Sequence, residues 1–348
     1  MRVATRPDNP LELAALAVGQ VPRPLFEGYF GLMAARTLMA GTSLGIFDAL
    51  QERPDDAAGL ARRLELDEQG VDALLVGLHS MNYLRFRNGA YSNSRQAERH
   101  LVKGAAEPLR ETLASFSYDM WNFMGQVEEV VRSGEPVGLH EGDPDDPWWR
   151  SYMNGLFELA NLRAPQVVKM IPADNPERLI DIAGGHGAYS LALCRRHPRL
   201  RATILELEGA ARIGREIVAG EDGGDRVTFE VGDMFEADLG SGNDIAMANS
   251  ILHHFDGPTN VKLLRRAHEA LAPGGTMAVV EQERPPEGKR GQQIGGLTGV
   301  LFYVTSKART YSGAELEGFL REAGFSEVKA RRSPLVPGVV VTTGKKEG

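Results

Sequence analysis

Residues 178–192 read Arg178-Leu-Ile-Asp-Ile-Ala-Gly-Gly-His-Gly-Ala-Tyr-Ser-Leu-Ala192, and this stretch decides the fold. The apolar residues within 179–182 predict a buried strand, and the pattern of residues 189–196 predicts a helix. Between the two elements, three glycines let the backbone turn tightly and approach a ligand: Gly184, Gly185 and Gly187. A strand, a glycine turn and a helix in this order indicate a nucleotide-binding site in an α/β fold.

Two acidic elements follow this turn. The run Ala202-Thr-Ile-Leu-Glu-Leu207 predicts a second strand, and its Glu206 lies roughly 20 positions beyond the glycines. At that spacing a carboxylate can accept hydrogen bonds from both hydroxyls of a ribose. The run Val231-Gly-Asp-Met234 follows a third predicted strand and adds a second acid, Asp233. The three elements together form a combination that chance seldom supplies.

This combination resembles the class I S-adenosylmethionine-dependent methyltransferases, and the likeness runs along nearly the whole chain. It is closer still to the small-molecule O-methyltransferases of the plant phenylpropanoid and bacterial polyketide type. The resemblance implies that S-adenosyl-L-methionine is the cofactor and S-adenosyl-L-homocysteine the product. It places Asp181 under the methionine part of the cofactor and Glu206 on the ribose, with Asp233 and Met234 beside the adenine. The cofactor-binding residues that it implies are Asp181, Gly184, Gly185, Gly187, Glu206, Leu207, Gly232, Asp233, Met234 and Asn249.

Two positions of the glycine turn depart from related patterns. A nicotinamide enzyme is expected to carry the full G-x-G-x-x-G, in which the last glycine allows close helix packing. This chain has Ser190 there, so methyl transfer is favoured over hydride transfer. The O-methyltransferases usually have glycine where this chain has Ala183, and one extra methyl group tightens the turn without abolishing binding.

Strands and helices alternate in the second half of the chain. Strands are predicted at 226–232, 244–251, 276–282 and in a final pair around 327–343, and helices at 258–272 and 312–323. Alternation of this kind predicts a doubly wound parallel sheet with helices on both faces and a ligand crevice at the carboxyl ends of the strands. Residues 173–348 are therefore predicted to form a Rossmann-like domain that binds S-adenosylmethionine and carries out catalysis.

Residues 1–172 are predicted to form a mainly helical domain. A helix-turn-helix pattern over 57–64 and 71–78 precedes a predicted hairpin at 83–94, whose tight turn is Asn88-Gly89. This winged-helix pattern raises DNA binding by a regulator as an alternative function. Acidic residues crowd the region where a recognition helix would face phosphates: Asp55, Asp56, Glu65, Asp67 and Glu68. The resemblance implies instead that the domain forms a homodimer and covers the substrate, without binding nucleic acid.

The chemistry is predicted to lie in Asn249-Ser-Ile-Leu-His-His-Phe-Asp256, after the fourth strand of the sheet. The resemblance aligns His253 with the residue that deprotonates the acceptor hydroxyl, a task that suits imidazole. It also implies that Glu281 orients His253. The second carboxylate of the family's pattern is replaced by Ala308, within Lys307-Ala-Arg-Thr310. The donor site therefore follows the family more faithfully than the acceptor site does.

The expected acceptor is a small hydroxylated, aromatic molecule, and its site is predicted to include Trp149, Met153, His254 and Phe302. For Trp149 and Met153, packing in the core at helical spacing is an equal alternative. The predicted activity is O-methylation with His253 as general base. Methylation of carbon, or redirected chemistry on a bound S-adenosylmethionine, remains open because of Ala183 and Ala308.

Composition sets the remaining expectations. The formal net charge of −8 gives no electrostatic footprint for nucleic acid. Cys194 is the only cysteine, which excludes a disulfide within the chain and a cysteine-based metal cluster, so we expect it in the core. No apolar run approaches the ~20 residues of a membrane span, and the start of the chain lacks a signal-peptide core. These features predict a cytoplasmic enzyme without a metal.

Overall fold

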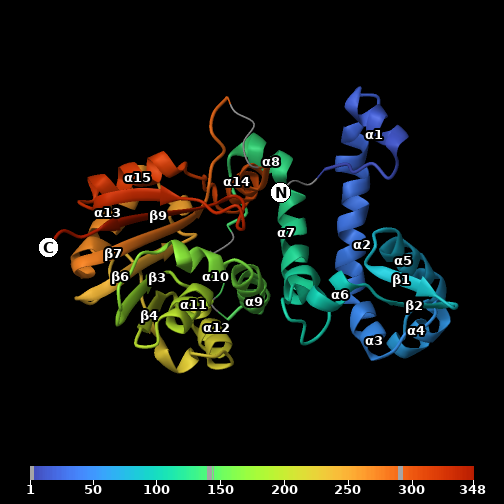
Figure 1. Ribbon diagram of the computed structural model, residues 1–348, viewed down its shortest axis with the longest axis horizontal. Helices are drawn as coiled ribbons and strands as arrows, with labels where there is room; N and C mark the ends of the chain where they lie inside the picture. The colour runs from blue at the N-terminus through green and yellow to red at the C-terminus, as the bar shows by residue number, and fades with distance from the viewer. Residues whose placement is uncertain (1–3, 139–142, 144, 289–292) are drawn as a thin grey trace. The chain divides into compact units, whose positions relative to one another are not determined.

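The computed structural model describes residues 4–138, 143, 145–288 and 293–348. The chain divides into two compact units, residues 2–118 and residues 119–348 (Figure 1). The division falls before the predicted boundary at residue 172. Residues 119–172 join the C-terminal unit because α9 (Trp148–Asn161) and α10 (Ala164–Val167) pack against the helices of its sheet.

The N-terminal unit is mainly helical, and its helix-turn-helix and hairpin agree with the sequence prediction. Asp56 and Asp67 cap two of its helices, each accepting a backbone N–H bond three residues on. Asn88 and Gly89 both have positive φ angles, 52° and 81°, which suits a tight two-residue turn. The elements are α1 (Pro10–Ala17), η1 (Leu25–Phe30), α2 (Gly31–Ser43), α3 (Ile46–Glu52), α4 (Ala57–Leu64), α5 (Glu68–Ser80), β1 (Leu84–Arg87), β2 (Ala90–Asn93), α6 (Arg95–His100) and η2 (Thr112–Phe116).

The C-terminal unit is a seven-stranded sheet between layers of helices. After α7 (Ser117–Met124), which crosses the division, and α8 (Val127–Ser133), the chain reaches α9, α10 and η3 (Val168–Met170). The sheet and its helices follow: β3 (Arg178–Ile182), α11 (Ala188–Arg196), β4 (Arg201–Glu206), α12 (Glu208–Ala219), η4 (Gly224–Arg226), β5 (Val227–Val231), β6 (Asn243–Asn249), η5 (Leu252–His254), α13 (Gly257–Ala270), β7 (Leu271–Gln282), α14 (Gln293–Ser306), α15 (Gly313–Glu322), β8 (Ser326–Arg331) and β9 (Val339–Lys345).

The strands lie in the order β5-β4-β3-β6-β7-β9-β8. The first five are parallel, as predicted, but β9 pairs antiparallel with both β7 and β8. The predicted parallel pairing therefore holds for the first five strands and not for the last two. The connection between β8 and β9 is short and contains no helix, whereas parallel neighbours need a long crossover.

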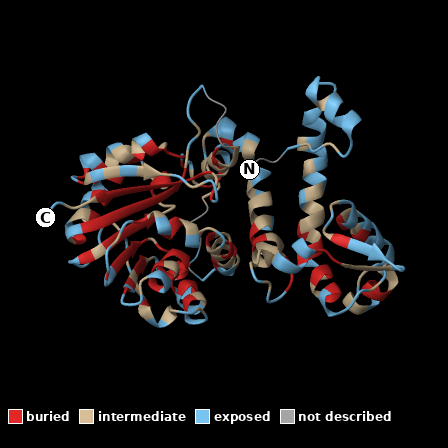
Figure 2. Cartoon of the chain, viewed as in Figure 1, coloured by how far each residue is buried: buried red, intermediate tan, exposed pale blue. Residues whose placement is uncertain are grey.

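The buried residues of the C-terminal unit lie mostly on the strands and on the helices that flank them (Figure 2). The apolar ones form two separate cores, one on each face of the sheet. One core packs β3, β4, β6 and β7 against α10 and α11, and it contains Cys194, which is fully buried as expected. The other core packs the opposite face against α13 and α15. Strand order reverses between β3 and β6, so their carboxyl ends border the crevice where such sheets bind ligands.

A membrane span needs a helix that is both long and apolar. Within the described ranges, no single helix meets these requirements for crossing a bilayer. One bent pair, Leu25–Ser43 with Ile46–Glu52, meets the length and composition criteria together.

Candidate active site

The glycine turn joins β3 to α11 as predicted. Gly187 adopts φ 73° and donates its N–H to the Gly184 carbonyl at 3.0 Å, which closes the turn. A Cβ atom at Gly184 would lie 2.5 Å from the Asp181 carboxyl carbon, too close for any side chain. Ala183 is also left-handed, with φ 55°, so its methyl group is held in a conformation that favours glycine.

Asp181, the last acid of β3, is buried beneath this turn. One carboxylate oxygen accepts a 2.6 Å hydrogen bond from the Ser190 hydroxyl, and the other is buried with no partner in the described part of the chain. Burial raises the pKa of Asp181 to about 7, with Ser190 opposing the rise and Glu206 adding to it. A cationic ligand in the turn would therefore meet a carboxyl group that lacks a cationic partner.

Glu206 ends β4 and reaches across to the glycine turn. Its two carboxylate oxygens accept the N–H groups of Gly185 at 2.9 Å and of Leu207 at 2.8 Å. Burial raises the pKa of Glu206, and these two backbone hydrogen bonds oppose the rise. The Leu207 side chain is 49% exposed.

The third element lies beside Glu206, since Gly232 donates its N–H to the Glu206 carbonyl at 3.1 Å. The exposed side chain of Asp233 accepts the Phe235 N–H at 2.7 Å, while Met234 packs against the core on the α13 side. Asn249 ends β6, the strand next to β3. The structure therefore brings the predicted cofactor residues to the carboxyl ends of adjacent strands.

These residues fit S-adenosylmethionine by their chemistry. The unpartnered oxygen of Asp181 suits the positive charge that the cofactor carries on its sulfonium and ammonium groups. Glu206 offers a carboxylate to the ribose hydroxyls, as acids at this position do in dinucleotide sites. Without side chains at Gly184 and Gly187, the turn packs closely on Asp181 and on Val218 of α12, with which a Cβ atom at these positions would clash.

Helix α9 covers part of this region. Met153 is 2% exposed, and its Cε atom lies 3.7 Å from the position that a Cβ atom of Gly185 would take. Trp149 and Met153 also pack with Ala210 and Ile213 of α12 in a small apolar cluster. Core packing, one of the two predicted roles for this pair, is therefore present, and Met153 adjoins the glycine turn as well.

His253 lies in η5, just after β6, and is 4% exposed. Its Nδ1 atom is 2.9 Å from one carboxylate oxygen of Glu281, and its backbone N–H donates to the other at 3.3 Å. Because an ionised carboxylate only accepts hydrogen bonds, Nδ1 carries the proton of the neutral ring and Nε2 keeps its lone pair. The predicted pairing of His253 with Glu281 is thus present.

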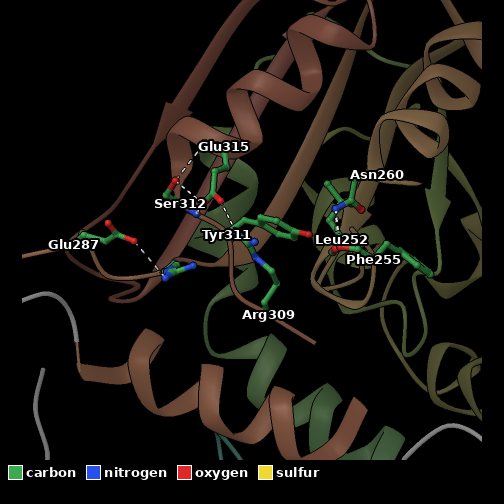
Figure 3. A network of polar contacts seen from close by, with 9 residues as sticks. Leu252, Phe255, Asn260, Glu287, Arg309, Tyr311, Ser312 and Glu315 are labelled. Carbon is green, nitrogen blue, oxygen red and sulfur yellow. Dashed lines mark hydrogen bonds and ion pairs between the residues drawn. The ribbon is translucent and has the colours of Figure 1, made fainter. Parts of the chain in front are cut away.

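The backbone of the His253 turn is held by residues from α13 and from the segment between α14 and α15 (Figure 3). Asn260 of α13 is fully buried, and its amide donates to the carbonyls of Leu252 at 3.0 Å and Phe255 at 3.2 Å. The Tyr311 hydroxyl also donates to the Phe255 carbonyl. The backbone N–H of Arg309 donates to the His253 carbonyl at 3.0 Å.

Side chains beyond the turn support these contacts. The Arg309 guanidinium lies 4.6 Å from the centre of the Tyr311 ring and pairs with Glu315. Glu315 in turn closes a capping box with Ser312 at the start of α15 (Figure 3). Ala308 is buried and provides no carboxylate, so Glu281 is the carboxylate that the described residues present to the His253 ring.

Sequence reasoning missed Asn260, Tyr311 and the bond from Ser190 to Asp181. Asn260 and Tyr311 act on backbone carbonyls, and residue spacing carries no record of such contacts. Ser190 did carry a signal, because it stands where a nucleotide-binding turn often has its last glycine.

Comparisons with known proteins agree with this geometry. A family model for the O-methyltransferase domain matches residues 134–326, and one for the O-methyltransferase dimerisation domain matches residues 26–103. The chain belongs to the O-methyltransferase family. It is an S-adenosylmethionine-dependent O-methyltransferase, and S-adenosylmethionine is its methyl donor.

Named relatives span nearly the whole chain. A 3-hydroxy-5-methyl-1-naphthoate 3-O-methyltransferase of Streptomyces sahachiroi is 30% identical over 324 residues, which is 89% of this chain and 92% of the relative. The acetylserotonin O-methyltransferase of Mus musculus is 31% identical, over 89% and 85% of the two chains. The solved structure of human N-acetylserotonin methyltransferase with SAM shares the fold, with a TM-score of 0.81, 19% identity and full coverage of both chains.

Proposed function

We propose that this O-methyltransferase methylates a phenolic hydroxyl of an aromatic small molecule, with His253 as the general base. The observation that carries the proposal is the buried pair of His253 and Glu281 at the carboxyl end of β6. That position borders the glycine turn, because β6 lies beside β3. The names of the two curated relatives, a hydroxynaphthoate and an acetylserotonin enzyme, support an aromatic acceptor.

The mechanism follows from this arrangement. When bound, S-adenosylmethionine supplies a methyl group on a positively charged sulfur. The acceptor hydroxyl would give its proton to Nε2 of His253, which would leave the oxygen able to accept that methyl group. Glu281 holds the ring through Nδ1 and stabilises the positive charge that the ring then carries.

The residues proposed to hold the cofactor are those gathered at the carboxyl ends of β3, β4, β5 and β6. Asp181 provides negative charge under the turn, and Glu206 receives the ribose. Asp233 and Met234, beside Glu206, are proposed to contact the adenine. Of the acceptor-site candidates, Met153 adjoins the turn and Phe302 and His254 contact the ring of His253, so these three are the better supported.

We also propose that the enzyme is a homodimer formed through its N-terminal unit. The dimerisation family model matches this unit, and apolar side chains of η1 and α2 are exposed in the single chain: Leu25, Phe26, Tyr29, Phe30, Leu32 and Met33. Light scattering after gel filtration tests this, and a monomer at micromolar concentration would refute it.

A two-step experiment tests the proposed mechanism. Calorimetry first measures S-adenosylmethionine binding to the wild type, His253→Asn and Glu206→Ala. Transfer of labelled methyl to a panel of phenols follows. His253→Asn should bind the cofactor normally but lose about 10²–10⁴-fold in kcat, the usual contribution of a general base. Glu206→Ala should weaken cofactor binding. Undiminished turnover by His253→Asn would refute the assignment of the base.

A further inference from the structure

We propose that Phe302 is a positioning residue that fixes the plane of the His253 ring, so that Nε2 meets the acceptor in one orientation. This inference rests on the proposed role of His253 as the general base. It assigns Phe302 a role towards the base itself, in addition to the role in acceptor binding that the sequence predicts.

The two rings are stacked face to face. Their centroids are 3.9 Å apart and their planes differ by 12°. The ring of His254 lies 4.2 Å from that of His253, with planes 42° apart. The near-parallel Phe302 ring therefore covers one face of the imidazole, while the His254 ring lies close to it at an angle.

One edge of the imidazole is fixed as well as the face that Phe302 covers. Nδ1 is bound to Glu281, which leaves the side of the ring that bears Nε2 for the acceptor. A rotation of the imidazole about its bond to Cβ would break the hydrogen bond to Glu281 and drive the ring into Phe302. The stack thus holds the imidazole in the one orientation in which Nδ1 binds Glu281 while Nε2 faces the acceptor hydroxyl.

The chain segment that follows Phe302 ties it to the His253 turn. The Ala308 N–H donates to the Phe302 carbonyl at 3.2 Å, and the next amide, that of Arg309, donates to the His253 carbonyl at 3.0 Å. Lys307 takes a left-handed conformation, φ 53°, to make this return. The backbone N–H groups of Ala308 and Arg309 therefore connect the end of α14 to His253, the residue that the Phe302 ring covers.

Nuclear magnetic resonance tests the stack without a known acceptor. Protein labelled at histidine is compared as wild type, Phe302→Leu and Phe302→Tyr, and the His253 signals are assigned by their loss in His253→Asn. We expect the wild type to show a ring-current shift at Hε1 of His253 and a single tautomer protonated at Nδ1. Phe302→Leu should lose the shift and populate both tautomers, and Phe302→Tyr should restore both features.

Kinetics then separate positioning from acceptor binding. Phe302→Leu should lower kcat by about 10- to 100-fold, the scale that a small misplacement of a reacting group produces. Its affinity for S-adenosylmethionine should be unchanged, and Phe302→Tyr should recover most of kcat. Tyr303→Leu, which removes a ring from the next position of α14, is the matched control and should keep the His253 signals.

Three outcomes would overturn the proposal: a single tautomer and an unchanged Hε1 shift in Phe302→Leu, a wild-type kcat in that variant, or a rise in the KM of the acceptor alone. Failure of the proposed function is distinguishable from these. If His253→Asn keeps full turnover while Phe302→Leu mixes the tautomers, the stack is real but His253 is not the base. If Phe302→Leu does not fold, Phe302→Met replaces it in the same comparison.

Discussion

Nδ1 of His253 lies 2.9 Å from a carboxylate oxygen of Glu281, although the two residues are 28 positions apart in sequence. Parallel pairing of β6 with β7 brings them together, because His253 follows the carboxyl end of β6 and Glu281 lies near the carboxyl end of β7. Glu281→Gln keeps the shape of the side chain but removes the charge that stabilises a protonated ring. We expect kcat to fall about 10²-fold, the lower end of what acid–base catalysis contributes, with cofactor affinity unchanged, as measured by methyl transfer and calorimetry.

The control for this prediction is Glu287→Gln, which removes a carboxylate whose side chain is 91% exposed and pairs only loosely with Arg284. This variant should retain wild-type turnover. Equal activities of Glu281→Gln and Glu287→Gln would contradict the role given to Glu281.

The hydrogen bonds that Asn260 and Tyr311 donate to the backbone of the His253 turn should contribute measurably to the free energy of unfolding. Asn260→Ala removes one buried and one partly buried hydrogen bond and should lower the free energy of unfolding by roughly 1–3 kcal/mol. Tyr311→Phe removes one bond, to Phe255, and should cost about 1 kcal/mol. Urea unfolding of the two variants checks the order. A larger loss in Tyr311→Phe than in Asn260→Ala would contradict it.

Much of the fold could be predicted because its signals are local. The apolar run before Gly184 and the periodicity after Tyr189 mark β3 and α11 within one stretch of sequence. The direction of a strand leaves no such mark. The final pair of strands was located correctly, but its antiparallel pairing depends on the short connection and on which sheet edge is free.

The residues of the site also divide into those that a local sequence signal marks and those whose contacts leave no such signal. Asp181, Glu206 and His253 stand at fixed places relative to strand ends, so a resemblance to known motifs could point to them. Phe302 was predicted for the acceptor site, but its stacking on His253 was not, and Tyr311 was missed. Both contacts depend on how far α14 and its return loop reach back to η5. Neither spacing nor residue type states that distance, and only the folded chain shows it.

The pH dependence of stability should report on Asp181. Burial raises its pKa from an ordinary 3.8 to about 7 in the folded chain, so the folded state binds a proton that the unfolded state has already lost. The stabilising contribution is complete below pH 4 and is lost as the pH rises towards 7. It amounts to roughly 4 kcal/mol for a difference of this size.

Asp181→Asn removes this titration. Unfolding free energies of the ligand-free wild type and the variant are compared between pH 5 and pH 8, and the wild type should lose more stability than the variant over that range. Other groups titrate in both proteins and cancel in the difference. Parallel pH profiles would show that Asp181 is charged throughout.

The left-handed Ala183 predicts a stabilising substitution. An L-residue in this conformation costs about 1–2 kcal/mol, and glycine avoids that cost while losing about 0.5–1 kcal/mol of chain entropy. Ala183→Gly should therefore raise the free energy of unfolding by up to about 1 kcal/mol. Ala192→Gly, in the interior of α11, is the control of opposite sign, and a loss of stability in both variants would refute the strain at Ala183.

Gly214 of α12 packs closely against the glycine turn between β3 and α11. A Cβ atom there would lie 2.5 Å from the Gly185 carbonyl oxygen and 2.7 Å from the ring of Phe229. Because the first of these is a backbone atom, Gly214→Ala must displace the turn itself, and we expect weaker S-adenosylmethionine binding together with lower stability. At Gly318 of α15, a Cβ atom would have no described atom within 4 Å, so Gly318→Ala should add about 0.5–1 kcal/mol of helix stability and leave binding unchanged. Calorimetry on both variants decides the matter: normal binding by Gly214→Ala would mean that the turn yields without loss, and that its position is not set by α12.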